Sequence, residues 1–137
     1  MGKISGISDA EWDVMNVVWA ADAPVTANAV VAALAGHKGW SPRTVKSMLN
    51  RLLNKGILGY QAVGNRYLYE PRVTREACVK SESRSFLSRV FGGAAGPMLV
   101  HFVSDADLSQ QDIDRLRMLL AAKTKKPEKR ASKPREK

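Results

Sequence analysis

Hydrophobic residues recur at helical spacing along most of this chain, and one short stretch alternates as strands do. The first apolar set is Trp12, Met15 and Trp19, which fall at i, i+3 and i+7. Ser8 precedes them with Glu11 three residues later, the pattern of a capping box at a helix start. This pattern predicts a helix of about three turns with the three apolar side chains in the core.

A second helix is predicted after Thr26, whose hydroxyl can cap it. Its apolar positions repeat at helical spacing and are Ala29, Val30, Ala33 and Leu34. Asp22-Ala23-Pro24 separates it from the first helix, and Gly36 and Gly39 are expected to bracket the connection that follows.

The third helical segment has the clearest ends. Ser41 is a good N-cap, Pro42 suits the first helical position, and Gly56 suits the stop. One face is apolar and holds Val45, Met48, Leu49, Leu52 and Leu53. The opposite face holds Arg43, Ser47, Asn50 and Asn54, flanked by Lys46 and Arg51. This outer face lacks acids and is predicted to be free to contact a partner.

After Gly56 the apolar pattern changes to that of strands. Residues 57–61 and 66–70 are short β-type runs, and Gly64-Asn65 between them favours a tight reversal. The order of helix, turn, helix with a basic face and then a hairpin predicts a winged helix-turn-helix.

From Thr74 onward helical patterns return. Apolar stripes occur in segments 74–91 and 98–103 and in a third segment capped by Ser109. These segments together have too few residues to form a stable hydrophobic core by themselves. We therefore expect a second copy to cover them. The residues expected at this dimer interface are Phe86, Leu87, Val90, Phe91, Leu99, Phe102, Ile113, Leu116 and Leu120.

The predicted fold is thus mainly α with a small β-hairpin wing, in three parts. A winged helix-turn-helix DNA-binding domain spans 1–72, and a helical dimerisation domain spans 73–122. Residues 123–137 are basic and almost without apolar side chains, which predicts a disordered tail.

Charge narrows the choice of partner. The 137 residues hold 22 Lys plus Arg against 13 Asp plus Glu, a net charge of +9. Eleven of the basic residues and only three acids fall within 38–89, as expected for a single binding face. Such a surplus favours polyanions, with nucleic acid first and an anionic membrane surface second.

The number of cysteines and the hydropathy of the sequence indicate the cellular compartment. The one cysteine, Cys78, excludes a disulfide framework within the chain and multi-cysteine metal sites, and it suits a reducing cytoplasm. Neither a membrane span nor a secretion signal is visible in the sequence. We expect a cytoplasmic protein with no stable membrane association.

The candidate DNA contacts divide by chemistry. Arg43, Thr44, Ser47 and Asn50 are the candidates for base contact, since they lie in the first half of the third helix. Phosphate contacts are expected from cations, namely Lys38, Arg43, Lys46, Arg51, Lys55 and Arg66. Trp40 is either a core residue or a platform that lines the groove, and we include it among the DNA-binding candidates.

Two alternative classes of function are an enzyme and a winged-helix interaction module. Catalysis is not expected, because the sequence has no His-Glu-x-x-His, no phosphate-cradling glycine motif and no Ser or Cys beside a base partner. His37 and His101 lack metal-ligand spacing, so we expect neither a metal nor a cofactor. The alternative is a winged-helix module for protein or RNA interaction without operator specificity.

Three motifs carry a family resemblance. They are Ile7-Ser8-Asp9-Ala10-Glu11-Trp12-Asp13-Val14-Met15, Trp40-Ser41-Pro42-Arg43-Thr44-Val45 and Arg51-Leu52-Leu53-Asn54-Lys55-Gly56. Together they resemble the penicillinase repressor and methicillin-resistance regulator family, which shares its DNA-binding half with the copper-operon repressors. The likeness continues in Leu99-Val100-His101-Phe102-Val103 and covers roughly residues 4–121.

The resemblance implies a dimeric bacterial repressor that sits on a palindromic operator of a resistance operon, such as one for β-lactam resistance. It also implies a membrane sensor protease as partner, whose signal leads to a cut before a phenylalanine that matches Phe102. The family residue before this cut is usually asparagine, and here it is His101. The copper-responsive branch carries a C-terminal cysteine cluster, and Cys78, the one cysteine of this sequence, cannot form such a cluster.

Overall fold

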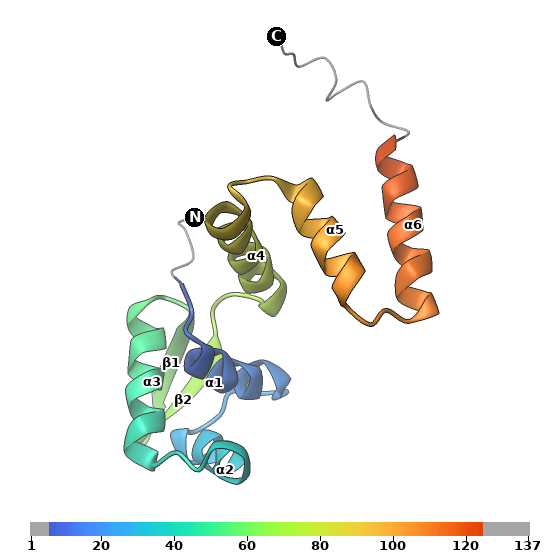
Figure 1. The fold of residues 1–137 in the computed structure, drawn as a ribbon. Helices are drawn as coiled ribbons and strands as arrows, with labels where there is room; N and C mark the ends of the chain where they lie inside the picture. The colour runs from blue at the N-terminus through green and yellow to red at the C-terminus, as the bar shows by residue number, and fades with distance from the viewer. Residues whose placement is uncertain (1–5, 125–137) are drawn as a thin grey trace. The chain divides into compact units, whose positions relative to one another are not determined.

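The computed structural model describes residues 6–124, except for the side chains of residues 37 and 38. These residues form six helices and one hairpin (Figure 1). In chain order the elements are α1 (Asp9–Ala20), α2 (Ala27–Lys38), α3 (Pro42–Asn54), β1 (Leu58–Val63), β2 (Arg66–Pro71), α4 (Arg75–Phe91), α5 (Ala95–Asp105) and α6 (Gln110–Thr124). The chain divides into two compact units, Met1–Gly93 and Ala94–Lys137.

The helix starts in the first unit follow the predicted caps. Ser8 and Glu11 form the capping box of α1, and Thr26 caps α2 by accepting a hydrogen bond from the Ala29 amide at 3.1 Å. Gly39 ends α2 in the left-handed conformation, with φ of +64°. The prediction that Gly36 begins the connection is wrong, because α2 continues through it to Lys38.

The hairpin is a two-stranded antiparallel sheet, as the alternating pattern predicted. Tyr60 pairs with Tyr69 and Val63 with Arg66, so the reversal falls at Gly64-Asn65. Gly64 has φ of +66°, a conformation that glycine adopts without the steric cost of a Cβ. The backbone of Tyr69 also pairs with Val25, which ties the hairpin to the segment before α2.

The core of the first unit lies between the three N-terminal helices and the base of the hairpin. Its fully buried side chains include Val14, Met15, Val30, Val45, Leu49, Leu52 and Ile57. The predicted stripe on α1 is displaced by part of a turn. Val14, Met15 and Val18 are buried, whereas Trp12 and Trp19 are half-buried and pack against the rim of the core. The difference arises because indole rings are wide enough to cover a core from its edge.

Helix α4 joins the first unit rather than the second. Cys78 in its first turn is fully buried in the core cluster. The Trp19 indole nitrogen donates to the Val73 carbonyl at 3.1 Å, and the Ile7 amide donates to Glu82 at 3.3 Å. By contacts the division therefore falls after Gly93, whereas the sequence placed it at 72/73.

The second unit is described by α5 and α6. Helix α5 runs from Ala95 to Asp105 and so extends beyond the predicted segment 98–103 at both ends. Ser109 caps α6 by accepting a hydrogen bond from the Asp112 amide at 3.0 Å. Helix α6 ends at Thr124, two residues into the range predicted as a tail. Residues 125–137, the rest of that predicted tail, lie outside the described residues. No described helix taken singly is long and apolar enough to cross a membrane.

Candidate nucleic-acid interface

Helix α3 is fixed in orientation by its own amphipathic sequence. Ser41 Oγ accepts from the Thr44 amide at 3.2 Å, and Pro42 occupies the first turn, where its missing N–H costs nothing. The buried face consists of Val45, Met48, Leu49 and Leu52. Burial of this apolar face leaves the opposite face pointing away from the core.

That opposite face is exposed and contains no acid. Its exposed side chains are Arg43, Lys46, Ser47, Asn50, Arg51 and Asn54. Five of these six were predicted as DNA contacts, and Asn54 was placed on the same face without a contact role. Guanidinium, amide and hydroxyl groups on one helix face are the groups that read base edges and phosphates.

Three other predicted contacts have different surroundings. Thr44 is half-buried, and its hydroxyl lies 3.1 Å from Ser41 Oγ, so it belongs in part to the helix cap. Trp40 is half-buried and packs against the hydrophobic core. Of the two predicted roles, this position favours that of a core residue over that of a platform lining the DNA groove. Lys38 ends α2, and its side chain lies outside the described part of the structure.

Lys55, expected as a phosphate contact, is engaged inside the protein. Its Nζ lies 2.6 Å from Glu11 Oε1 and 2.7 Å from the Gly6 carbonyl oxygen. Glu11 is 1% exposed, and its Oε2 has no hydrogen-bond partner among the described residues. Burial raises the pKa of Glu11, but the Lys55 hydrogen bond and charge, together with the Ser8 hydrogen bonds, lower it below its ordinary value.

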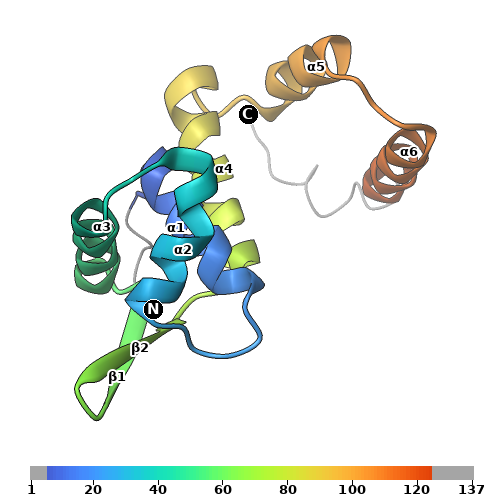
Figure 2. The ribbon, with the colours of Figure 1, turned by 90° about the horizontal axis from the view of Figure 1, so that it is seen from below.

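The hairpin projects beyond the helices on the same side of the unit as α3 (Figure 2). Arg66 begins β2 and is exposed, as predicted for a wing residue. Tyr60 and Tyr67 stack with ring centroids 4.3 Å apart, and Tyr67 meets Tyr69 edge-on at 6.2 Å. Burial raises the pKa of Tyr69, and the neighbouring Tyr67 and Tyr60 raise it further. These contacts stiffen the wing that carries Arg66.

A polar hollow of about 750 Å³ lies between the start of α2, α3 and the hairpin. We call it the wing hollow. Its polar lining includes Asn28 of α2, Lys46 of α3, and Asn65, Arg66 and Tyr67 of the hairpin. Asn28, Asn65 and Tyr67 were not among the predicted DNA contacts, because nothing in their own segments indicates that they share one lining. Only the packing of three separate elements brings them together.

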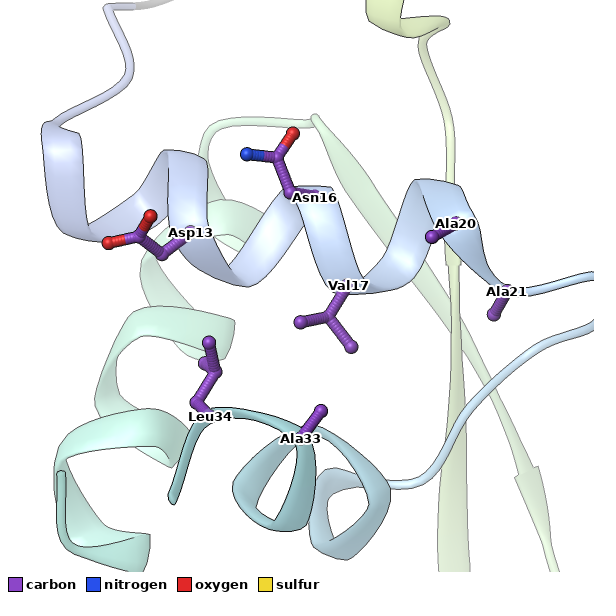
Figure 3. A pocket seen from close by; sticks show the side chains of 7 residues that line it. All are labelled: Asp13, Asn16, Val17, Ala20, Ala21, Ala33 and Leu34. Carbon is purple, nitrogen blue, oxygen red and sulfur yellow. The ribbon is translucent and has the colours of Figure 1, made fainter. Parts of the chain in front are cut away.

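A second hollow, also of about 750 Å³, lies between α1 and α2 (Figure 3). The apolar side chains of Val17, Ala33 and Leu34 lie between the two helices, and Asp13 and Asn16 are the polar members of its lining. None of the described residues that line it is basic, so this lining offers no positive charge to a polyanion.

The residues predicted for dimerisation fall in both units. On α4, Phe86, Leu87 and Phe91 are half-buried, and Val90 is 54% exposed. In the second unit no residue of α5 or α6 is buried within the described range, and Leu99, Phe102 and Leu120 are exposed.

Between α5 and α6 lies an apolar groove of about 520 Å³. It is lined by apolar side chains that include Leu99, Val103, Ile113, Leu116 and Leu120.

His101 and Phe102 lie in the middle of α5, with their rings 6.0 Å apart. The Phe102 side chain is 45% exposed. Within residues 6–124 no group of three His, Cys, Asp or Glu side chains is placed to hold a metal ion.

Comparison with known proteins places these features in a family. A family model described as penicillinase repressor matches residues 7–122. The penicillinase repressor of Bacillus licheniformis is 35% identical over 120 residues, which cover 88% of this chain and 93% of the relative. Methicillin resistance regulatory protein MecI of Staphylococcus aureus (strain N315) is 32% identical over 121 residues, which cover 88% of this chain and 98% of the relative.

The winged-helix part has a solved counterpart. The solution structure of the DNA-binding domain of the repressor BlaI is 38% identical in sequence and superposes with a TM-score of 0.50. The match covers 56% of this chain and 93% of that domain. The predicted winged helix-turn-helix is thereby confirmed.

Proposed function

The chain belongs to the penicillinase repressor family, and we propose that it acts as a homodimer that holds a palindromic operator until an inducing signal releases it. The family consists of DNA-binding transcriptional repressors, so the chain is a DNA-binding regulator and not an enzyme. The observation that carries the proposal is the exposed, acid-free face of α3 beside the projecting wing.

Binding begins with charge and ends with base contacts. Lys46, Arg51 and Arg66 are exposed and can displace counterions from phosphates, which makes affinity fall with salt. Arg43 can fork onto a guanine and Asn50 onto an adenine when α3 enters the major groove. Thr44 offers its methyl group to a thymine, since its hydroxyl is held at the cap.

Dimerisation is proposed from the second unit. One reading helix contacts about four base pairs, which discriminates too weakly for a genome, and a dyad doubles the specifying contacts. The apolar groove and the exposed Leu99 and Leu120 support a self-association surface. Neither α5 nor α6 has a buried residue, and two such helices gain a core by pairing with a second copy. In the first unit, Val90 near the end of α4 is a separate exposed apolar side chain that could contribute to self-association.

Release is proposed through cleavage between His101 and Phe102, brought about by the signal of a membrane sensor protease. A protease needs an extended substrate, so α5 has to open locally. Two features of α5 favour opening. Ala94 gives the helix no side-chain cap. The Ser104 hydroxyl donates a hydrogen bond to the Val100 carbonyl at 2.8 Å, a contact that slightly destabilises a helix. The names of the relatives favour an operon of β-lactam resistance as the target.

Selection from a random duplex pool with the full chain tests the operator proposal. The expected product is an inverted repeat whose half-sites lie one helical turn, or a multiple of it, apart. Single-stranded DNA and RNA of the same length serve as competitors. Selected duplexes without symmetry, or equal competition by RNA, would contradict a dimer on a palindromic operator.

A further inference from the structure

Residues 6–8, which we call the 6–8 strap, form polar contacts with three helices of the first unit. We propose that this strap couples α4 to the reading helix α3, with Glu82 of α4 as a positioning residue for the base-contacting face. This inference rests on the proposed function and specifies how the direction of the reading face is set by residues that lie outside the DNA interface.

One peptide group of the 6–8 strap joins α3 to α4. Its carbonyl, from Gly6, accepts a hydrogen bond at 2.7 Å from Nζ of Lys55, the C-cap residue of α3. Its N–H, from Ile7, donates to Glu82 Oε2 on α4 at 3.3 Å. A peptide group is planar and rigid, so its two ends turn together. The ammonium at one end and the carboxylate at the other polarise the group in the same sense, and each therefore strengthens the hydrogen bond of the other.

The 6–8 strap has little freedom to absorb a movement of α4. The Ile7 side chain is 7% exposed and belongs to the hydrophobic core. The Ser8 amide donates to Glu11 Oε1 at 2.9 Å, and the same oxygen lies 2.6 Å from Lys55 Nζ. Because both neighbours of the bridging peptide group are held in this way, a displacement of Glu82 acts on the contact between the strap and Lys55.

Helix α4 has a defined position against the rest of the first unit. Just before it, the Val73 carbonyl accepts a hydrogen bond from the Trp19 indole nitrogen at 3.1 Å. In its first turn Cys78 is fully buried, and Glu82 follows one turn later and is half-buried. Burial raises the pKa of the Cys78 thiol, and the charge of Glu82 raises it further. The Glu82 carboxylate therefore lies on the core side of α4, where it meets the strap.

The 6–8 strap gives α3 a connection to α4 that differs from the rest of its packing. Helix α3 packs mainly against α1, α2 and β1. Because a helix moves as a rod, a tilt set at Lys55 is carried to Arg43 and Asn50 on the exposed face. Helix α4 is the last helix of the first unit, which ends at residue 93. A displacement of α4 thus reaches the reading face through Glu82 and the strap.

Substitutions at Glu82 in the full chain test its positioning role. Glu82→Ala removes the acceptor of the Ile7 amide, whereas Glu82→Gln keeps a side-chain oxygen in its place. The matched control is Glu76→Ala, which removes the same charge from an exposed position of the same helix. The quantity measured is the ratio of affinity for the selected operator to affinity for a random duplex, because a change in net charge alters both affinities alike.

We expect Glu82→Ala to lower this ratio about fivefold and Glu82→Gln to lower it less than about twofold. Glu76→Ala should leave it unchanged. Thermal unfolding verifies that each variant is folded at the assay temperature, so that a loss of stability is not read as a loss of preference. A ratio for Glu82→Ala within about twofold of the wild type, or equal losses in the alanine and glutamine variants, would overturn the role of Glu82.

Combining Glu82→Ala with Lys55→Met tests the path through the 6–8 strap. Both substitutions break hydrogen bonds of one peptide group, so the double variant should lower the ratio by less than the product of the two single effects. A loss equal to that product would show that Glu82 and Lys55 act independently and would exclude the strap as their connection.

Amide hydrogen exchange without DNA separates this inference from the proposed function. Glu82→Ala should speed exchange of the Lys55 and Gly56 amides, which bond to carbonyls of α3, about two- to tenfold, and Glu76→Ala should not. If no duplex is preferred but exchange changes as expected, the operator proposal fails and the coupling stands. If exchange is unchanged, the coupling fails whether or not an operator is selected.

Discussion

Replacing Lys55 with methionine tests the buried ion pair between α1 and the end of α3. The substitution keeps an apolar stem but removes the ammonium group 2.6 Å from Glu11 Oε1. Glu11 is 1% exposed, so its carboxylate loses a partner without gaining full hydration. Removing one member of a buried pair costs about 3–5 kcal/mol, and we expect about 3 kcal/mol here because the Lys55 side chain is 28% exposed.

The cost should depend on pH in a defined direction. In the wild type the pKa of Glu11 lies below its ordinary value of 4.5, so this group stabilises the fold above that pH and loses its contribution as pH falls through the folded pKa. In Lys55→Met burial remains, and we expect the folded pKa to rise above the unfolded one. Protonation then favours the folded variant, and the stability gap between the two proteins should shrink from pH 7 towards 4.5.

Urea unfolding at pH 7 and pH 5 measures both effects. Lys80→Met, an exposed position on α4, is the control and should stay within about 0.5 kcal/mol. Combining Glu11→Gln with Lys55→Met should restore at least about 1 kcal/mol, because no unpaired charge is then buried. A cost for Lys55→Met below about 1 kcal/mol, or a cost equal at the two pH values, would refute the reasoning.

Three further predictions concern the core, the reading face and self-association. Leu49→Ala should cost about 2–5 kcal/mol in urea unfolding, since Leu49 is fully buried, and a smaller loss would mean that the core collapses onto the cavity. Arg43→Ala should relax base preference at one position per half-site in a selection experiment, while Arg51→Ala should weaken all duplexes alike; equal effects would contradict the assigned roles. Leu99→Asp should weaken dimerisation at least about tenfold in sedimentation experiments, and an unchanged dimer would exclude the α5–α6 groove as the interface.

Local sequence signals predicted most of the first unit, because the physics behind them is local. A cap acts within one turn, so Ser8, Thr26 and Ser41 each mark a helix start that the structure confirms. The hairpin follows from alternation and from Gly64, which adopts a positive φ at the reversal. The exposed face of α3 follows from the position of its buried face.

Features that join distant segments could not be predicted in this way. Lys55 and Glu11 are 44 residues apart, and nothing in either sequence neighbourhood indicates that they form an ion pair. The wing hollow likewise combines Asn28 with Lys46 and Tyr67, each ordinary in its own segment. Burial of Cys78 assigns α4 to the first unit by contacts, although the same helical pattern would suit a helix that packs elsewhere.

The basic residues of α3 and of its C-cap have two different surroundings in the fold. Arg43, Lys46 and Arg51 stay exposed, while Lys55 is held by the same carboxylate that accepts a hydrogen bond from the Ser8 amide at the start of α1. A free Lys55 would add only sequence-independent attraction to phosphates. Paired, it ties the end of α3 to the start of α1 and so helps to fix the direction in which the reading face points. Because a small rotation of a helix moves its outer side chains away from base edges, we expect the proposed sequence preference to depend in part on Lys55 and Glu11, neither of which is proposed to contact a base.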